Sequence, residues 1–422
     1  MNSRRSFIQQ LGLGMALPAI SGFDFPSRSI STFPSSDLQG EDFWTELRSQ
    51  FPLTTDRVYL NNGTFGPAPF SVLQAMEASN LQINTSGEYG NSDQERVKLA
   101  EFFRIKPTEF SITHNTTEGI NIMAWGVPMK SGDEVILTTH EHAGNALPWL
   151  NRAKLDGIVL RTFEPKSTQA ENLTEIQKLI NPRTKVIAIP HVTCTTGLVF
   201  PIKEICEIAR KKGILTAIDG AHGAGTFDLD LYDLGCDFYA GCFHKWMLGP
   251  SGTAFLFIRE ESLEKLKAVM IGGHSDIGWD MTANPPEFKG YVPSARRFDY
   301  GTQSKSLAVG MVAAADFHNQ IGKQQVQSRV KELNQYLFDG LVKLGSKIEI
   351  LTPLEEESRI SIVSFRTKNM DFNACGAELG KAGFRIRLVH EGKVNAVRVS
   401  THVYNSKAEL DAFLKELGRI LA

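Results

Sequence analysis

The chain has 422 residues, of which 42% are hydrophobic and 22% charged, and its formal net charge is -2. This is ordinary globular composition, long enough for more than one domain, and the near-neutral charge gives no reason to expect a nucleic-acid partner. The five cysteines are an odd number without a CxxC pair, which argues against a disulfide framework and against a thiolate zinc site.

The N-terminal segment differs from the rest of the chain. Arg4 and Arg5 precede a modest apolar run at residues 11–20, and a stretch rich in Ser and Pro follows. Adjacent arginines ahead of a mildly hydrophobic run resemble a twin-arginine (Tat) signal, so we interpret residues 1–40 as a Tat-type signal and linker. This predicts export of the folded protein through the Tat machinery, to the periplasm or otherwise out of the cytoplasm. The alternative is a basic disordered tail on a cytoplasmic protein, and cleavage of the signal stays open.

From about residue 41 onward, the sequence pattern predicts an α/β protein. Amphipathic helical patterns alternate with short apolar strands as far as residue 258. Helices are expected at residues 43–51, 71–84, 94–103, 173–180 and 202–212, and strands at residues 58–60, 135–139, 158–163, 185–190, 214–218, 238–240 and 253–258. Repeated strand–helix–strand units predict a mostly parallel sheet covered by helices on both faces.

The C-terminal part predicts a second, smaller α/β domain. After two consecutive helical patterns, short strands alternate with helices. The expected strands cover residues 348–351, 360–365, 385–388 and 396–400, and the later helices cover residues 373–382 and 406–420. We therefore expect an N-terminal segment at residues 41–64 that packs with the small domain, a large domain at residues 65–305 and the small domain at residues 306–422.

Chemically active side chains follow the predicted strands of the large domain. His142, Asp219 and Lys245 each come at or just after a strand's carboxyl end. In open α/β sheets ligands bind beyond these ends, so we expect the three side chains to meet. Lysine is rarely buried unless it is paired or used, and a desolvated lysine amine is a nucleophile for Schiff-base chemistry.

Other candidates lie at a helix start, in the last strand and in a turn-rich loop. Thr116 and Thr117 open a helix, where they either cap it or hold a phosphate. In the last strand Arg398 points away from the face shared by its two valine neighbours, and it either binds a carboxylate or forms an ion pair on the sheet. Asn62 lies in the loop at residues 61–67, whose turn residues allow the backbone to approach a ligand closely.

Taken together, these segments resemble the class V aminotransferase superfamily of fold-type I enzymes, which use pyridoxal 5′-phosphate (PLP). The resemblance covers nearly everything from Tyr59 to Leu421. The matching segments are YLNNGTFGPAP, NTTEGIN, HEHAGNALPW, IPHVTCTTG, DGAHGAG, HKWMLGPSG, RFDYGT and RVSTHVYN. The nearest branch is the isopenicillin N epimerase-like proteins. The resemblance implies a large domain with a mostly parallel sheet of the seven-stranded type and a smaller C-terminal α/β domain.

The resemblance also implies catalytic roles. Lys245 would form the Schiff base with PLP and later move the α-proton of the substrate. Asp219 would pair with the protonated pyridine nitrogen, which keeps the ring an electron sink. His142 would stack on the ring, and His222 sits where relatives carry a Gln or His near the ring oxygen.

The remaining roles concern the phosphate and the substrate. Thr116 and Thr117 would hold the phosphate with help from His244. Thr302 matches the position that reaches the phosphate of the neighbouring subunit in relatives, which implies a homodimer with a shared site. Arg398 would bind the α-carboxylate of the amino-acid substrate, and Asn62 is the second substrate-binding candidate.

Two positions depart from the family pattern. Many relatives have an Asn near the ring in the segment at residues 191–197, where the nearest match here is Cys194. Many also have a Ser as a further phosphate ligand ahead of the His-Lys pair, where this chain has Cys242.

Several reactions stay open at this stage. The preferred one is epimerisation or racemisation at Cα, for which His222, Tyr300 and Cys194 are candidates for the second acid. A class V aminotransferase and a carbon–sulfur lyase are alternatives. A cysteine desulfurase is disfavoured because residues 389–397 contain no cysteine.

Two hypotheses fall outside PLP chemistry. A metal site built from His140, His142 and His222 would leave Lys245 and Asp219 unexplained, so we assign no metal ligands. A binding protein without catalysis would have no use for that lysine and its acidic partner.

Overall fold

The computed structural model describes residues 33–35 and 37–422. The arginine pair and most of the segment interpreted as a Tat-type signal therefore lie outside the described residues, and that interpretation stays a prediction. Among the residues that are described, no helix is both long and apolar enough to cross a membrane.

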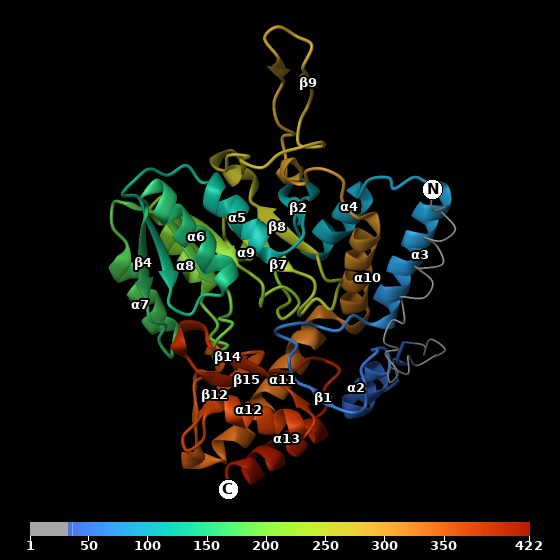
Figure 1. The fold of residues 1–422 in the computed structure, drawn as a ribbon, viewed down its shortest axis with the longest axis vertical. Helices are drawn as coiled ribbons and strands as arrows, with labels where there is room; N and C mark the ends of the chain where they lie inside the picture. Colours follow the sequence, from blue (N-terminus) through green and yellow to red (C-terminus); the bar gives the residue numbers. More distant parts are fainter. Residues whose placement is uncertain (1–32, 36) are drawn as a thin grey trace, which may run out of the picture. The chain divides into compact units, whose positions relative to one another are not determined.

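A seven-stranded sheet forms the larger part of the fold, in the order β2-β8-β7-β6-β5-β3-β4 (Figure 1). Its strands are β2 (Phe110–Thr113), β3 (Glu134–Thr138), β4 (Val159–Phe163), β5 (Thr184–Pro190), β6 (Leu215–Asp219), β7 (Phe238–Cys242) and β8 (Ala254–Ile258). Only β8 runs against the others, because it pairs antiparallel with both of its neighbours while the remaining pairs are parallel. The predicted mostly parallel sheet between helices is confirmed.

Helices cover both faces of this sheet, and the alternation of side chains along β7 shows how. Phe238 and Ala240 point to a core shared with α5 (Thr116–Gly126) and α6 (Ala143–Asp156). Tyr239 points to the opposite core. That core is shared with α3 (Phe70–Ser86), α4 (Asp93–Phe102), α7 (Gln169–Leu179), α8 (Ile202–Lys211) and α10 (Lys305–Ile321). Successive strand residues face opposite sides, so one buried strand supplies two cores.

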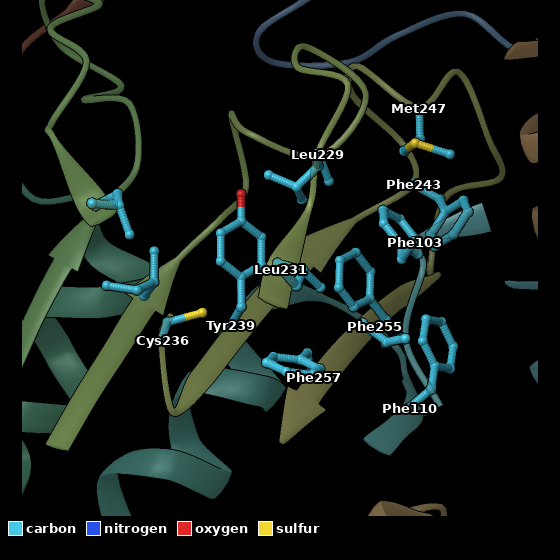
Figure 2. Packing of buried hydrophobic residues seen from close by; sticks show 14 of the residues in the cluster. Phe103, Phe110, Leu229, Leu231, Cys236, Tyr239, Phe243, Met247, Phe255 and Phe257 are labelled. Carbon is cyan, nitrogen blue, oxygen red and sulfur yellow. The ribbon is translucent and has the colours of Figure 1, made fainter. Parts of the chain in front are cut away.

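The core around Tyr239 is rich in aromatic rings (Figure 2). Phe255 lies near the centre, with its ring centroid 4.4 Å from Phe103 and 5.4 Å from Phe110. Each such ring removes a large apolar area from water. This packing holds β7 and β8 rigidly, and β7 leads directly to Lys245.

A four-stranded antiparallel sheet forms the C-terminal part, in the order β11-β12-β15-β14. Its strands are β11 (Ile348–Ile350), β12 (Ile362–Thr367), β14 (Arg387–Val389) and β15 (Ala396–Ser400), and it packs on α11 (Lys323–Val342), α12 (Phe372–Lys381) and α13 (Lys407–Ile420). After the N-terminal helix α2 (Gly40–Arg48), β1 (Val58–Tyr59) pairs in parallel with β13 (Phe384–Arg385). The first strand of the chain thus joins a strand near its end. The proposed domain boundary at residue 305 stays a prediction.

Between β8 and α10 the chain forms a projecting arm (Figure 1). Its tip is an antiparallel pair of two-residue strands, β9 (Trp279–Asp280) and β10 (Glu287–Phe288). Trp279 and Phe288 are largely exposed.

Candidate active site

The carboxyl ends of β3, β6 and β7 bring the predicted residues together, as expected for a parallel sheet. Asp219 is the last residue of β6, and His142 and Lys245 follow β3 and β7. They line a cavity of about 260 Å³, close to the lower end of the range of about 300–1,000 Å³ typical of small-molecule sites. Six predicted residues line this cavity, namely Thr116, Thr117, His142, Asp219, His244 and Lys245.

The loop that carries Lys245 is held by backbone contacts. Leu248 closes it in a left-handed conformation (φ 55°), and the Gly249 N–H donates to the Phe243 carbonyl oxygen at 2.7 Å. From the other side, the Gly66 N–H donates to the His244 carbonyl oxygen at 2.8 Å. A Cβ at Gly66 would lie 1.8 Å from the Lys245 carbonyl oxygen, so only glycine permits this approach. The turn-rich loop predicted to approach a ligand thus supports the lysine.

The N-terminus of α5 supplies an anion-binding end to the cavity. The helix cap is Asn115, whose Oδ1 accepts from the Glu118 N–H at 2.9 Å. Thr116 and Thr117 are the first two helical residues, so the expectation that a threonine caps this helix is wrong. Their N–H groups and hydroxyls remain at the positive end of the helix and line the cavity.

Asp219 provides a buried carboxylate to the same cavity. Its Oδ1 accepts from the Ala221 N–H at 3.0 Å, which fixes the side chain against the turn after β6. The side chain is almost fully buried yet reaches the cavity lining. A carboxylate in this position can hold a protonated nitrogen of a bound molecule.

The histidines at the cavity are neutral rings at pH 7. His142 is half-buried and caps α6, and its Nδ1 accepts from the Gly144 N–H at 3.0 Å. Burial, followed by the charge of Lys245, lowers the pKa of His142. The same two causes lower the pKa of His244 to about 4. Both side chains can therefore stack or donate a hydrogen bond, but His244 adds no positive charge to a phosphate site.

Arg398 lies completely buried behind the cavity. Its guanidinium donates to the Cys194 carbonyl oxygen at 2.7 Å and to Thr64 Oγ1 at 2.9 Å. Burial, and then Arg387, lower the pKa of Arg398 to about 9, which leaves it cationic at pH 7. Thr64 itself lines the cavity, so a carboxylate in the cavity would meet a desolvated cation close behind that hydroxyl.

Arg387 lines the cavity from β14, although it was not among the residues predicted from the sequence. It lies opposite Arg398 in the register of β14 and β15, and it forms an ion pair with Glu391. The alternation of Arg385 and Arg387 with Ile386 was the available signal, because it places both arginines on one face of a strand.

Besides Arg398, three predicted residues do not line the cavity. His222 is buried next to it, with Nε2 at 3.4 Å from Lys245 Nζ. Asn62 is fully buried, and its Oδ1 accepts from the Tyr404 hydroxyl at 2.9 Å. Thr302 is exposed and lies in a separate hollow beside Arg96. The roles predicted for these residues stay predictions.

The two departures from the family pattern are buried thiols. Burial raises the pKa of Cys194 to about 11 and also raises the pKa of Cys242. Cys242 lines the cavity, and its Sγ donates to the Ala221 carbonyl oxygen at 3.7 Å.

The histidines of the metal hypothesis have other partners. His140 Nε2 pairs with Glu164 at 3.0 Å, while Nδ1 of both His142 and His222 accepts from an N–H group. Within the described part of the chain, no group of three His, Cys, Asp or Glu side chains is arranged to hold a metal ion.

The cavity residues fit the chemical groups of PLP. Free N–H groups at the α5 terminus suit its phosphate, the Asp219 carboxylate suits its pyridine nitrogen, and the Lys245 amine suits its aldehyde. The Thr116 Oγ1 is buried without a hydrogen-bond partner of good geometry in the described residues, as expected of a ligand-binding hydroxyl.

Comparison with known proteins agrees with this chemistry. The family model "Aminotransferase class-V" matches residues 75–413. A probable cysteine desulfurase of Halalkalibacterium halodurans is 30% identical, over 89% of this chain and 97% of that protein. The isopenicillin N epimerase of Streptomyces clavuligerus is 29% identical, over 89% and 98% of the two chains.

Solved structures of C-DES share the fold. C-DES described as a cystine C–S lyase, in complex with its product cysteine persulfide, is 26% identical with a TM-score of 0.79, over 87% of this chain and 99% of that chain. A lysine-to-alanine mutant of C-DES carries glycine covalently linked to its PLP cofactor, with a TM-score of 0.80, 26% identity, and coverage of 88% and 98%.

Proposed function

Because this chain belongs to the class-V aminotransferase family of PLP-dependent enzymes, we propose that it acts at Cα of an α-amino acid as an epimerase or racemase. The observation that carries this proposal is a single cavity lined by Lys245, Asp219 and the N-terminus of α5, with Arg398 directly behind it. These groups bind a cofactor and an amino acid side by side.

Each side chain has a defined task in this proposal. Bound PLP supplies the electron sink that allows the Cα–H bond to break heterolytically. Asp219 would hold the proton on the pyridine nitrogen. Lys245 Nζ takes the proton from one face of Cα, and inversion requires a second acid that supplies a proton to the opposite face. Arg398 binds the α-carboxylate and thereby orients Cα toward the lysine. The neutral ring of His142 covers the cofactor.

Sulfur transfer to an enzyme thiol is disfavoured by the state of the cysteines. All five cysteines are free and buried. Burial raises the pKa of every one of these thiols. The thiolate is the nucleophilic form, so none of these cysteines is suited to accept sulfur.

A carbon–sulfur lyase is the second candidate. The likeness to C-DES, described as a cystine C–S lyase, supports it. Elimination from Cβ uses the same proton removal at Cα and needs no enzyme thiol, so the buried cysteines do not count against it. The two candidates differ in the product released.

The proposal includes a homodimer and Tat export. Thr302 is exposed and lies outside the cavity of its own chain. This position is consistent with binding of the phosphate in the site of a partner subunit. Light scattering of the purified protein tests the dimer, and a Tat reporter fused to residues 1–40 tests export. A monomeric active enzyme would contradict the shared site.

The first experiment is an absorbance spectrum of the purified protein before and after borohydride, with mass mapping of the reduced adduct. We expect a visible band that collapses on reduction and an adduct on Lys245. Lys245→Ala should abolish both, whereas Lys212→Ala, at an exposed position just after α8, should change neither.

A panel of amino acids in deuterated water then identifies the reaction. We expect α-proton exchange with loss of chirality and without release of keto acid or sulfide. Sulfide release would favour the lyase, and keto acid would favour an aminotransferase. Turnover that persists in Lys245→Ala would contradict the mechanism altogether.

A further inference from the structure

The two ring nitrogens of His222 have different neighbours. Its Nδ1 accepts a hydrogen bond from the Trp246 Nε1–H at 3.0 Å, while its Nε2 lies 3.4 Å from Lys245 Nζ. The ring is only 4% exposed, and Gly63 lies next to it. His222 is therefore held in one orientation between the indole and the amine.

This arrangement determines where His222 carries its proton. An indole N–H only donates, so Nδ1 must present a lone pair. Burial is the largest cause that lowers the pKa of His222 well below its usual range. The ring is thus neutral at pH 7. A neutral imidazole with a lone pair on Nδ1 carries its proton on Nε2, the nitrogen that faces Lys245.

Trp246 is itself fixed from the C-terminal part of the chain. Its carbonyl oxygen accepts from His402 Nε2 at 3.0 Å, and its ring stacks on that of His402 with centroids 5.7 Å apart and planes inclined by 29°. His402 stacks in turn on Tyr404. The indole is completely buried, so solvent water cannot accept a hydrogen bond from its N–H.

We infer that Trp246 is a positioning residue whose indole N–H fixes His222 as an N–H donor directed at the Lys245 amine. Only an amine with a free lone pair accepts such a hydrogen bond, and this is the form of lysine that attacks a carbonyl. The inference rests on the proposed role of Lys245 as the site of PLP attachment.

Nitrogen-15 NMR of the cofactor-free protein with ring-labelled histidine tests the tautomer directly, without any catalytic activity. The His222 signals are assigned by their loss in His222→Gln. We expect a protonated Nε2 and an unprotonated Nδ1 at neutral pH. Trp246→Phe keeps a buried ring but removes the donor, and should release His222 into a mixture of tautomers. The matched control is Trp149→Phe, which removes a buried indole N–H that donates to Asn145 at 3.3 Å.

The rate at which added PLP attaches to Lys245, followed by absorbance and by borohydride trapping, supplies the functional readout. Trp246→Phe should slow attachment by about five- to ten-fold, the effect of about one lost hydrogen bond. His222→Gln keeps an acceptor for Trp246 and a donor for Lys245, so it should be slowed clearly less than His222→Leu. His222→Leu loses both functions and should be slowed as much as Trp246→Phe or more.

Three results would overturn the inference, namely a wild-type His222 that is cationic or protonated on Nδ1, a Trp246→Phe protein with unchanged tautomer and rate, or a His222→Gln protein as slow as His222→Leu. If Trp246→Phe does not fold, the wild-type spectrum and the two His222 variants still decide. If wild-type protein never attaches PLP at Lys245, the proposed function fails, while the NMR result on the tautomer remains separately readable.

Discussion

Acid should destabilise this protein through histidines that folding buries as neutral rings, and His191 allows the effect to be measured. His191 directly follows β5. Its ring stacks on that of Phe227 with centroids 4.6 Å apart, and its Nδ1 lies 3.0 Å from the Tyr239 hydroxyl. Burial lowers the pKa of His191 to about 3. In the unfolded chain the pKa of histidine is about 6.5, so below that pH the unfolded state binds one more proton than the folded state.

The sign and the magnitude follow from this difference. A depressed folded-state pKa means that the stabilisation is complete above pH 6.5 and is lost as the pH falls toward 3. Each pH unit in that window changes the free energy of unfolding by about 1.4 kcal/mol. The fall from pH 7 to pH 5 should therefore lower this free energy by about 2 kcal/mol through His191. His402, whose pKa burial also lowers to about 3, adds to the same trend.

Urea unfolding at pH 5, 6 and 7 measures the free energy of unfolding of the wild type and of His191→Asn. The variant loses ring packing and should be less stable at pH 7, but its deficit should shrink by about 2 kcal/mol at pH 5, because the asparagine does not titrate. His390→Asn, at an exposed position, is the control and should keep the wild-type slope. An unchanged deficit for His191→Asn between pH 7 and pH 5 would refute the assignment of a buried neutral ring.

Other predictions concern the site. Arg398→Gln should raise the KM for the amino acid by about 10- to 100-fold with a smaller change in kcat, since a buried charge-assisted hydrogen bond is lost. An unchanged KM in steady-state kinetics would instead assign binding of the substrate carboxylate to Arg387. Gly66→Ala should displace the loop that carries Lys245 and lower the extent of PLP attachment measured by absorbance. It should also lower the free energy of unfolding in urea by about 1–3 kcal/mol. The control Gly380→Ala has open space around its Cβ and should change neither quantity. Native protein should react with Ellman's reagent only slowly at pH 8, because all five thiols are buried; fast labelling of one cysteine coupled to loss of activity would reopen the desulfurase hypothesis.

The local pattern of apolar and polar residues was sufficient to predict most helices and strands and the location of the site. The helix α8 was predicted within a residue because Ile202, Ile205, Cys206 and Ala209 repeat at helical spacing, and all four are buried. The missed elements include β2 and α6. Strand β2 buries Ser111, whose hydroxyl donates to Asp299 at 2.6 Å, and α6 contains Pro148. In a strand this short the apolar Phe110 and Ile112 give only a weak periodic signal, and the internal proline of α6 argues against a helix.

The sequence by itself determined the strand–helix alternation and therefore the edge of the sheet at which His142, Asp219 and Lys245 had to meet, because these depend on side-chain periodicity and the direction of parallel strands. It could not determine which partners surround each side chain. Arg398 bonds to the Cys194 backbone, 204 positions away in the sequence, and Trp246 orients His222 across a turn while stacking on His402. Only the tertiary structure decided these contacts, along with the buried state of the thiols and the place of Thr302 outside the cavity, because burial and hydrogen-bond partners arise when distant segments pack.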